Sequence, residues 1–409
     1  MRDHAATLPA LGRSSGKSAA DAARNGVLIS PSVREAASLI SASADEVRVA
    51  RAALFPSLSL SLGGGVGDAG QGDAAVDLVG EQQLTSFGDT ERAIKVADLD
   101  LQLRFLEFQT VVDETLSDVL FAVQDVAMHK ELLSVRTAHL RQLRNLEGLV
   151  AARIENGAST RTEALEARSR VQAAEFTVLD TELALAEARD KLYRLSGQSE
   201  GARIDLIAGS CGASALSEEM VRVRLEFLRS RLELERAERA RLPRITASPL
   251  VRGDLEDGST SFGLNIGVRS DVLEGGALTA RARAARNALA AAAARVETVA
   301  LEQDLEERGL TRSLTTGAQR VGLLERQIAL LAETRDLYRN QYFDLGTRRL
   351  AELLEQEQDY SMRSAELVEE RADLIKSRIR CAVREGTLRG QLDIEAQSLY
   401  GFPLAFDPV

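Results

Sequence analysis

Residues 54–62, Leu-Phe-Pro-Ser-Leu-Ser-Leu-Ser-Leu, decide the fold of this chain. From Pro31 up to Leu54, the first residue of this stretch, apolar residues recur with a helical period. Phe55-Pro56 ends that pattern because proline excludes the preceding residue from the helical region. Leucine and serine then alternate strictly from Ser57 to Leu62, which predicts a strand with one apolar face and one hydroxyl face.

A second strand and a very long helix are predicted to follow. Residues 75–84 alternate less regularly after a glycine-rich turn at residues 63–72. From Gly88 onward, apolar residues recur about every 3.6 residues, the period of an α-helix. No proline or glycine interrupts this pattern before Gly148. The pattern predicts a helix that reaches about Glu155, roughly 65 residues or about 100 Å long.

The long helix is predicted to be the first arm of a helical hairpin. Asn156-Gly157 ends it, and Thr160 and Glu163 have the spacing of a capping box that starts the next helix. The second helix is expected to end at Gly197. Residues 88–196 are therefore predicted to form a hairpin whose tip is at Gly157.

The second half of the chain repeats this order. Pro56 and Pro243 are separated by 187 residues, and Gly157 and the second predicted tip, Gly346, by 189. Helices are predicted at 218–242, 277–345 and 347–384, with strands at 245–252 and 262–268. The predicted organisation is a flexible N-terminal arm (1–29), repeat 1 (30–197), an inter-repeat segment (198–216), repeat 2 (217–388) and a C-terminal tail (389–409).

The composition excludes several classes of function. A net charge of −11 and a pI near 5.1 argue against a nucleic-acid-binding protein. Three His and two Cys exclude a His-rich metal centre and a disulfide framework. Residues 12–18, Gly-Arg-Ser-Ser-Gly-Lys-Ser, lack the first glycine of a phosphate-binding loop, and no catalytic motif is found. We expect no enzyme activity, no cofactor and no metal.

The predicted elements require several copies of the chain. Four strands cannot close a barrel, whereas three chains supply twelve, an even number that suits an outer-membrane barrel. The expected fold is mainly α with a small β part, a long coiled-coil-like α-helical barrel joined to a membrane β-barrel and closed as a homotrimer. No run of 18 apolar residues predicts a membrane helix. The apolar strand residues expected to face outer-membrane lipid are Leu58, Leu60, Leu62, Phe262, Leu264, Ile266 and Val268.

Taken in order, these motifs resemble the TolC outer-membrane efflux family over roughly residues 30–390. The stretches that carry the resemblance are 54–60, 84–88, 157–165, 192–197, 346–355 and 386–388. The resemblance implies an exit duct with its helical part in the periplasm, fed by a periplasmic adaptor and an inner-membrane pump. No signal peptide is visible at Met1–Ala10, so an exported protein would need a targeting segment outside this chain.

The resemblance also implies a periplasmic gate at the two hairpin tips. The matching positions in this sequence are Thr162, Glu163, Phe343, Arg348, Glu352 and Glu355. Glu stands where the family's prototype has Asp, and Phe where it has Tyr, so the contacts of the closed gate need not be the same. The alternative is that these are ordinary capping and surface charges at a helix start, where acidic residues are favoured. Cys211 and Cys381 both lie in regions that the family places at the equator, and free thiols are favoured over a disulfide.

Alternative functions stay open at this point. Type I protein secretion with an ABC transporter as pump is favoured because residues 346–388 look closer to that branch of the family. A drug or metal efflux duct of the same family is the alternative. A soluble coiled-coil structural or adaptor protein is the alternative of another class, although such a protein would not need the Ser/Leu alternation at 57–62.

Overall fold

The computed structural model describes residues 8–66, 72–200, 204, 211, 217–255, 258–270 and 275–405. Contacts divide the chain into two compact units. The first, here the helical unit, comprises Met1–Arg34, Gln109–Ser217 and Gln303–Val409. The second, here the sheet unit, comprises Glu35–Phe108 and Glu218–Glu302. No helix in the described ranges is long and apolar enough to cross a membrane.

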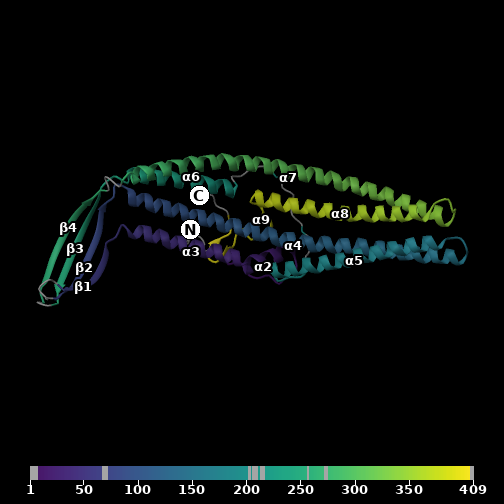
Figure 1. Ribbon diagram of the computed structural model, residues 1–409, viewed down its shortest axis with the longest axis horizontal. Coiled ribbons are helices and arrows are strands. Elements are labelled where there is room, and N and C mark those ends of the chain that lie inside the picture. The colour runs from purple at the N-terminus through teal and green to yellow at the C-terminus, as the bar shows by residue number, and fades with distance from the viewer. Residues whose placement is uncertain are drawn as a thin grey trace. The chain divides into compact units, whose positions relative to one another are not determined.

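The elements lie in the following order along the chain (Figure 1). In the first half they are α2 (Ala19–Ile29), α3 (Pro31–Ala52), β1 (Ser57–Val66), β2 (Gly72–Thr85), α4 (Asp89–Glu155) and α5 (Arg161–Ser196). In the second half they are α6 (Glu218–Arg239), β3 (Arg244–Asp254), β4 (Thr260–Arg269), α7 (Ala277–Phe343), α8 (Leu350–Arg384), α9 (Leu388–Gln391), β5 (Ser398–Leu399) and β6 (Phe402–Pro403). The predicted helices and strands between residues 31 and 384 are therefore all present, with ends that differ by a few residues.

The two longest helices, α4 and α7, have 67 residues each. Asp89 and Glu91 lie in the first turn of α4, where a carboxylate is favoured by the partial positive charge of the helix end. At the other end, Gly157 has a φ of 69°, a left-handed conformation that glycine adopts without steric cost. Gly346 after α7 has a φ of 63°. Both predicted tips are thus real chain reversals.

The sheet unit contains an antiparallel sheet of order β1-β2-β3-β4. Leu60 lies opposite Leu78 in the β1–β2 pair, Leu78 opposite Val251 in the β2–β3 pair, and Val251 opposite Phe262 in the β3–β4 pair. Residues directly opposite each other share a face, so one apolar face continues across all four strands. β1 and β4 are the outer strands, each paired with one neighbour.

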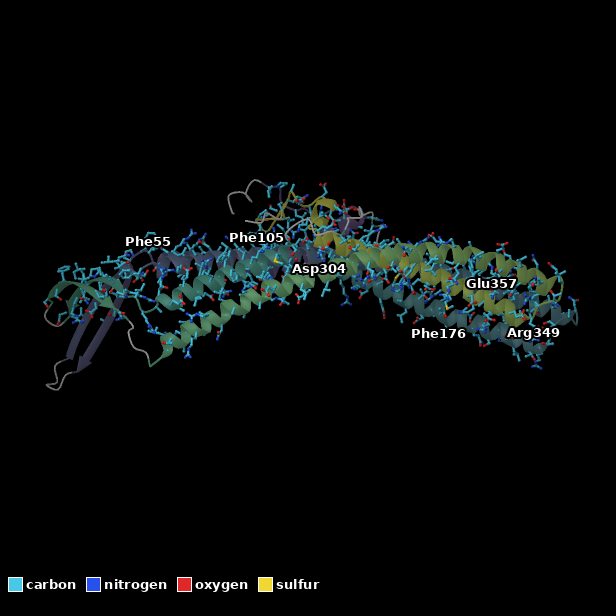
Figure 2. All side chains as sticks on the ribbon, turned by 90° about the horizontal axis from the view of Figure 1, so that it is seen from above. Phe55, Phe105, Phe176, Asp304, Arg349 and Glu357 are labelled. Atoms are coloured by element: carbon cyan, nitrogen blue, oxygen red, sulfur yellow. A yellow bond between two sulfur atoms is a disulfide. The ribbon has the colours of Figure 1, made fainter. Side chains whose placement is uncertain are left out.

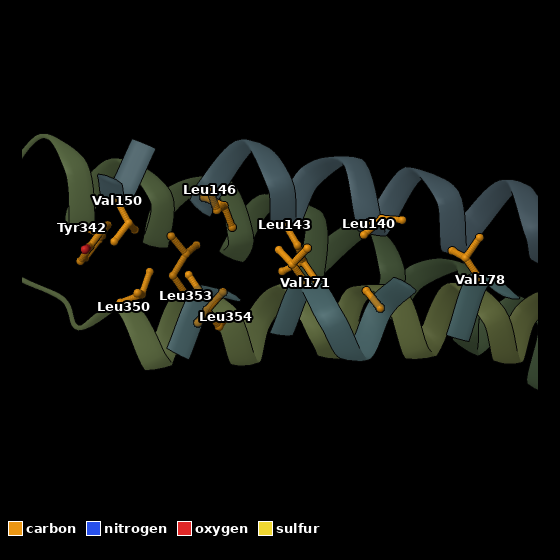
Figure 3. Close-up of a cluster of buried hydrophobic side chains, with 12 residues drawn as sticks. Leu140, Leu143, Leu146, Val150, Val171, Val178, Tyr342, Leu350, Leu353 and Leu354 are labelled. Carbon is orange, nitrogen blue, oxygen red and sulfur yellow. The ribbon is translucent and has the colours of Figure 1, made fainter. Parts of the chain in front are cut away.

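An apolar cluster of the helical unit lies between the ends of the two helical hairpins (Figure 3). It consists of fully or almost fully buried aliphatic side chains together with Tyr342. α4 contributes Leu140, Leu143, Leu146 and Val150, α5 contributes Ala167, Val171, Ala174 and Val178, and α8 contributes Leu350, Leu353 and Leu354. The cluster fixes hairpin α4–α5 against hairpin α7–α8 within one chain.

The prediction of a flexible arm at residues 1–29 is wrong for the described residues 18–29, which form α2 and its cap. The hydroxyl of Ser18 accepts a hydrogen bond from the backbone N–H of Asp21, and the Asp21 carboxylate accepts one from the backbone N–H of Ser18. This capping box satisfies donors at the helix start, and Ala23 and Val27 are completely buried. The capping box uses Asp rather than Glu, and the Ala/Ser/Gly-rich composition concealed it. Residues 1–7 lie outside the described residues.

The C-terminal tail, predicted at residues 389–409, is also structured where it is described. Arg389 in α9 is buried and donates two hydrogen bonds of 2.8 Å to the carboxylate of Asp113 on α4. It also donates to the backbone oxygens of Gln109 (2.8 Å) and Leu404 (2.9 Å). The backbone N–H of Ser398 donates to Pro9 O (2.9 Å), which connects the two chain ends. Residues 406–409 lie outside the described residues.

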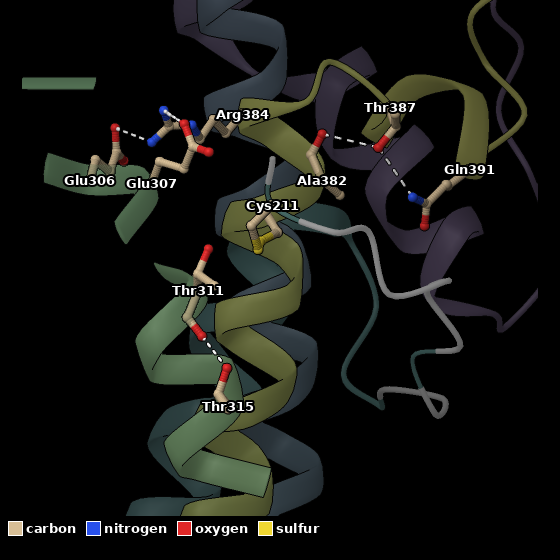
Figure 4. Close-up of a disulfide and its surroundings, with 10 residues drawn as sticks. Cys211, Glu306, Glu307, Thr311, Thr315, Ala382, Arg384, Thr387 and Gln391 are labelled. Carbon is tan, nitrogen blue, oxygen red and sulfur yellow. Dashed lines mark hydrogen bonds and ion pairs between the residues drawn. A yellow bond between two sulfur atoms is a disulfide. The ribbon is translucent and has the colours of Figure 1, made fainter. Parts of the chain in front are cut away.

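The prediction that Cys211 and Cys381 are free thiols is wrong. The two residues form a disulfide with a Cα–Cα distance of 5.1 Å (Figure 4). Both side chains are fully buried against Leu310 and Leu314 of α7. The bond links the inter-repeat segment to α8 across a separation of 170 residues, which the spacing in the sequence did not reveal. Most of the predicted segment 198–216 lies outside the described residues.

Candidate functional site

The apolar face of the sheet is the first candidate functional surface. The seven strand residues predicted to face lipid all lie on this face and are between 63% and 80% exposed in the single chain. Such a continuous exposed apolar surface is unusual for a protein in water. The structure therefore places the predicted residues of β1 and β4 on one face of the sheet. Contact with lipid stays a prediction.

The opposite face of the sheet carries most of its polar side chains, together with Val79 and Leu250. Ser57, Ser59 and Ser61 lie on this face of β1, and the hydroxyl of Ser59 donates to Val79 O (3.3 Å). Asp77 and Arg252 lie directly opposite each other in the β2–β3 pair. The Arg252 guanidinium donates two hydrogen bonds to the Asp77 carboxylate, Nε to Oδ1 at 2.6 Å and a terminal nitrogen to Oδ2 at 2.8 Å. No pattern in the sequence indicated this pair.

The hairpin tips are the second candidate surface, and the first tip is a capped helix start. The backbone N–H of Glu163 donates to Thr160 Oγ1 (3.3 Å), and the Glu163 carboxylate accepts from the backbone N–H of Thr160 (3.2 Å). The predicted capping box is confirmed. Glu163 therefore has the capping role that the sequence analysis offered as the alternative to a gate, and the adjacent Thr162 is exposed.

At the second tip, Arg348 is bound within its own chain. Its terminal nitrogen pairs with Glu352 Oε2 (3.0 Å), and its Nε donates to Gln341 Oε1 (3.0 Å). Its guanidinium carbon also lies 4.5 Å from the ring centroid of Tyr338, within cation–π range. Glu355 lies one turn after the start of α8 and is exposed. The structure thus places Arg348 and Glu352 together and leaves the Glu355 side chain accessible.

Arg153, which the sequence analysis did not single out, joins the two tips. Its guanidinium donates to Tyr342 O (3.2 Å) and Phe343 O (3.0 Å), the last carbonyls of α7, and to Ala158 O (3.2 Å). It also lies 4.9 Å from the Tyr342 ring centroid. The carbonyls at a helix end have no partner within the helix, so a cation there satisfies them. An arginine in the last turn of α4 was the available sequence signal.

Two titratable groups of the helical unit have shifted pKa values: Glu357 is buried and His139 is half-buried. Burial raises the pKa of Glu357 on α8, with Arg335 Nε at 3.9 Å partly opposing that effect. Gln142 of α4 donates to Glu357 Oε1 (3.4 Å). Burial lowers the pKa of His139, also on α4. No group of His, Cys, Asp and Glu in the described ranges is arranged to hold a metal ion.

Comparison with known proteins confirms the family resemblance. Residues 28–198 match the model of the family described as "Outer membrane efflux protein". A 225-residue stretch is 24% identical to Protein CyaE of Bordetella pertussis. This stretch covers 53% of the present chain and 48% of CyaE. The chain therefore matches about half the length of this curated relative.

Solved structures share the mainly helical chain fold with its few strands. The outer membrane protein VceC from Vibrio cholerae is similar with a TM-score of 0.82 and 16% identity, over 90% of this chain and 96% of VceC. The CmeC outer membrane channel of Campylobacter jejuni is similar with a TM-score of 0.81 and 10% identity, over 95% of this chain and 87% of CmeC. At these identities the likeness concerns the fold alone.

Proposed function

We propose that this chain, which has the fold of outer-membrane efflux channels, is one protomer of a homotrimeric outer-membrane exit duct. The observation that carries the proposal is the four-stranded sheet, one face of which is apolar and exposed while the other carries most of the polar side chains. An isolated sheet of this kind leaves its outer strands β1 and β4 with unpaired backbone groups, which hydrocarbon does not tolerate.

The strand directions favour closure between copies. All three strand pairs of the sheet are antiparallel, so β4 of one copy runs antiparallel to β1 of the next when the sheet is continued in the same order. Three copies then form a ring of twelve antiparallel strands, an even number as in bacterial outer-membrane barrels. The leucine face contacts lipid and the serine face lines the lumen in this arrangement.

Exposed apolar side chains on the helical unit support the same assembly. On α5, Phe176, Leu179 and Leu183 follow a helical spacing and are 73%, 63% and 60% exposed; Phe176 is labelled in Figure 2. On α7, Leu323, Leu330 and Leu337 recur every seven residues and are 58%, 65% and 53% exposed. A seven-residue apolar repeat is the pattern by which helices pack against partner helices. We propose that neighbouring copies cover these stripes and close the α-helical barrel.

The proposed partners follow from the family. An exit duct of this kind works with a periplasmic adaptor and an inner-membrane pump, and type I protein secretion with an ABC transporter is the favoured system, on the motif resemblance of residues 346–388. A drug or metal efflux system is the alternative. The disulfide between Cys211 and Cys381 supports a location outside the cytoplasm, because structural disulfides persist in oxidising compartments such as the periplasm.

The mass of the purified protein in detergent tests this proposal. Light scattering with correction for bound detergent is expected to give three times the chain mass of 44.2 kDa. Planar bilayers containing the trimer are expected to conduct ions. A stable monomer that keeps its helix content without detergent would instead support the soluble structural or adaptor protein.

A further inference from the structure

We propose that Asp77 and Arg252 form a charge-paired ring on the luminal face of the barrel and set the ion selectivity of that part of the duct. The inference rests on the proposed function, because it needs three copies with their polar faces inward. It concerns a pair of residues whose role in permeation is independent of the gate predicted at the hairpin tips.

The pair lies in one row of residues that crosses the whole sheet. Ser61 of β1 is opposite Asp77 of β2, Asp77 is opposite Arg252 of β3, and Arg252 is opposite Ser261 of β4. Residues alternate between the faces along a strand, so this row lies on the face opposite to the leucines. Repeated in three copies, the row would run once around the lumen, with Ser261 of one copy leading to Ser61 of the next.

The geometry of the pair makes it a fixed feature of this face. Two parallel hydrogen bonds join the guanidinium to the carboxylate, an arrangement that restricts both side chains. The Asp77 side chain is only 22% exposed, whereas that of Arg252 is 55% exposed. Arg252 therefore presents its charge to the polar face while it partly covers the carboxylate.

The neighbouring residues leave the pair as the main source of charge at this level. The next row toward the helices consists of Ser59, Val79, Leu250 and Gly263, which carry no charge. On the same face, Asp254 lies two positions along β3 from Arg252, and Glu81 lies four positions along β2 from Asp77. Arg252 thus compensates Asp77 on a face whose nearest other charges are acidic.

Loss of either partner should leave a ring of like charges. Rings of acidic side chains favour cations in channels, and rings of basic ones favour anions. Arg252→Gln would expose three carboxylates at one level, and Asp77→Asn would leave three guanidinium groups. Neighbouring strands are about 4.8 Å apart, so Ser61 lies within about 10 Å of the charges of Asp77 and Arg252. At 0.1 M salt, electrostatic interactions over about 10 Å are only partly screened, so both charges affect an ion or reagent at Ser61.

Reversal potentials across a KCl gradient test the proposal. Relative to the parent trimer, Arg252→Gln is expected to shift the potential toward the K⁺ equilibrium value, and Asp77→Asn toward the Cl⁻ value. The double exchange Asp77→Arg with Arg252→Asp keeps the pair and is expected to retain the parent value. Arg168→Gln, which removes an exposed arginine from α5, is the matched control and should change nothing.

Cysteine labelling provides a second readout in the same channels. Both native cysteines are joined in the buried disulfide, so Ser61→Cys supplies a distinguishable thiol. The ratio of its reaction rates with cationic and anionic methanethiosulfonates should rise when Arg252→Gln is added and fall when Asp77→Asn is added. Trimers whose reversal potentials and labelling ratios are the same in all variants would overturn the paired ring and leave the duct intact. A parent protein that neither trimerises nor conducts would overturn the proposed function and this inference together.

Discussion

Replacement of Leu60 by arginine tests whether the apolar face of the sheet contacts lipid. Leu60 lies in the middle of β1, opposite Leu78, and its side chain is 72% exposed in the single chain. Its own chain therefore provides little cover for this side chain. In the proposed trimer the environment of Leu60 is the hydrocarbon of the membrane.

The expected cost follows from this position. An arginine that faces lipid near the membrane midplane costs about 2–4 kcal/mol in an outer-membrane barrel. A trimer carries three copies of the change, so the total is about 6–12 kcal/mol. That range is similar to the whole stability of many folded domains, about 5–15 kcal/mol. We therefore expect Leu60→Arg to reduce strongly the amount of trimer recovered from outer-membrane fractions. Leu264→Arg on β4 should have the same effect.

The adjacent residue provides the matched control. Ser59 lies on the polar face and loses only its hydrogen bond to Val79 O when it is replaced, a net cost of about 0.5–1.5 kcal/mol. Ser59→Arg is expected to assemble normally and to alter conductance. If Ser59→Arg and Leu60→Arg impair assembly equally, the two faces do not separate lipid from lumen, and the barrel assignment fails.

Three further predictions concern the helical unit. Arg348→Ser should raise the resting conductance in planar bilayers. Glu352→Ala combined with Glu355→Ala should weaken cation selectivity and block by multivalent cations. If both variants conduct like the parent protein, these residues are only surface charges. Arg389→Met leaves a buried carboxylate unpaired and should cost about 3–5 kcal/mol in chemical denaturation, with faster hydrogen exchange in α9. Burial raises the pKa of Glu357 in the folded protein. The contribution of this group to the free energy of unfolding is therefore complete below the ordinary Glu pKa, and it is lost as the pH rises through the pKa of the folded state. Glu357→Gln should therefore raise the thermal midpoint at pH 8 and have less effect at pH 4; the opposite trend would contradict the assignment.

Local patterns were sufficient to predict most of the fold. The Ser/Leu alternation at 57–62 predicts β1 because the side chains of a strand alternate with a period of two, and that period is independent of the rest of the chain. The uninterrupted apolar stripe predicts α4 for the same reason with a helical period. The tips at Gly157 and Gly346 were predictable because only glycine adopts their left-handed backbone at little cost.

Long-range pairings could not be predicted from such patterns. Arg389 and Asp113 are 276 residues apart, and nothing near either residue indicates that a buried partner exists. The same holds for the pair of Asp77 and Arg252, which depends on the register between β2 and β3. The register is set by contacts across the sheet, so it becomes visible only when both strands are placed.

The intrachain contacts at the tips bear on how a gate would work. In the single chain Arg348 is bound to Glu352, and the Glu163 carboxylate caps α5, so an interchain bond between Arg348 and Glu163 has to compete with contacts that already exist. Exposed ion pairs contribute only about 0–1 kcal/mol, which makes such an exchange of partners inexpensive in either direction. Arg153 differs, because its bonds to the last carbonyls of α7 join the two hairpins of one chain. A gate built on these tips would therefore open by exchange of the exposed Arg348 contacts between neighbouring chains, while each pair of hairpins moves as one body held by Arg153 and the apolar cluster behind it.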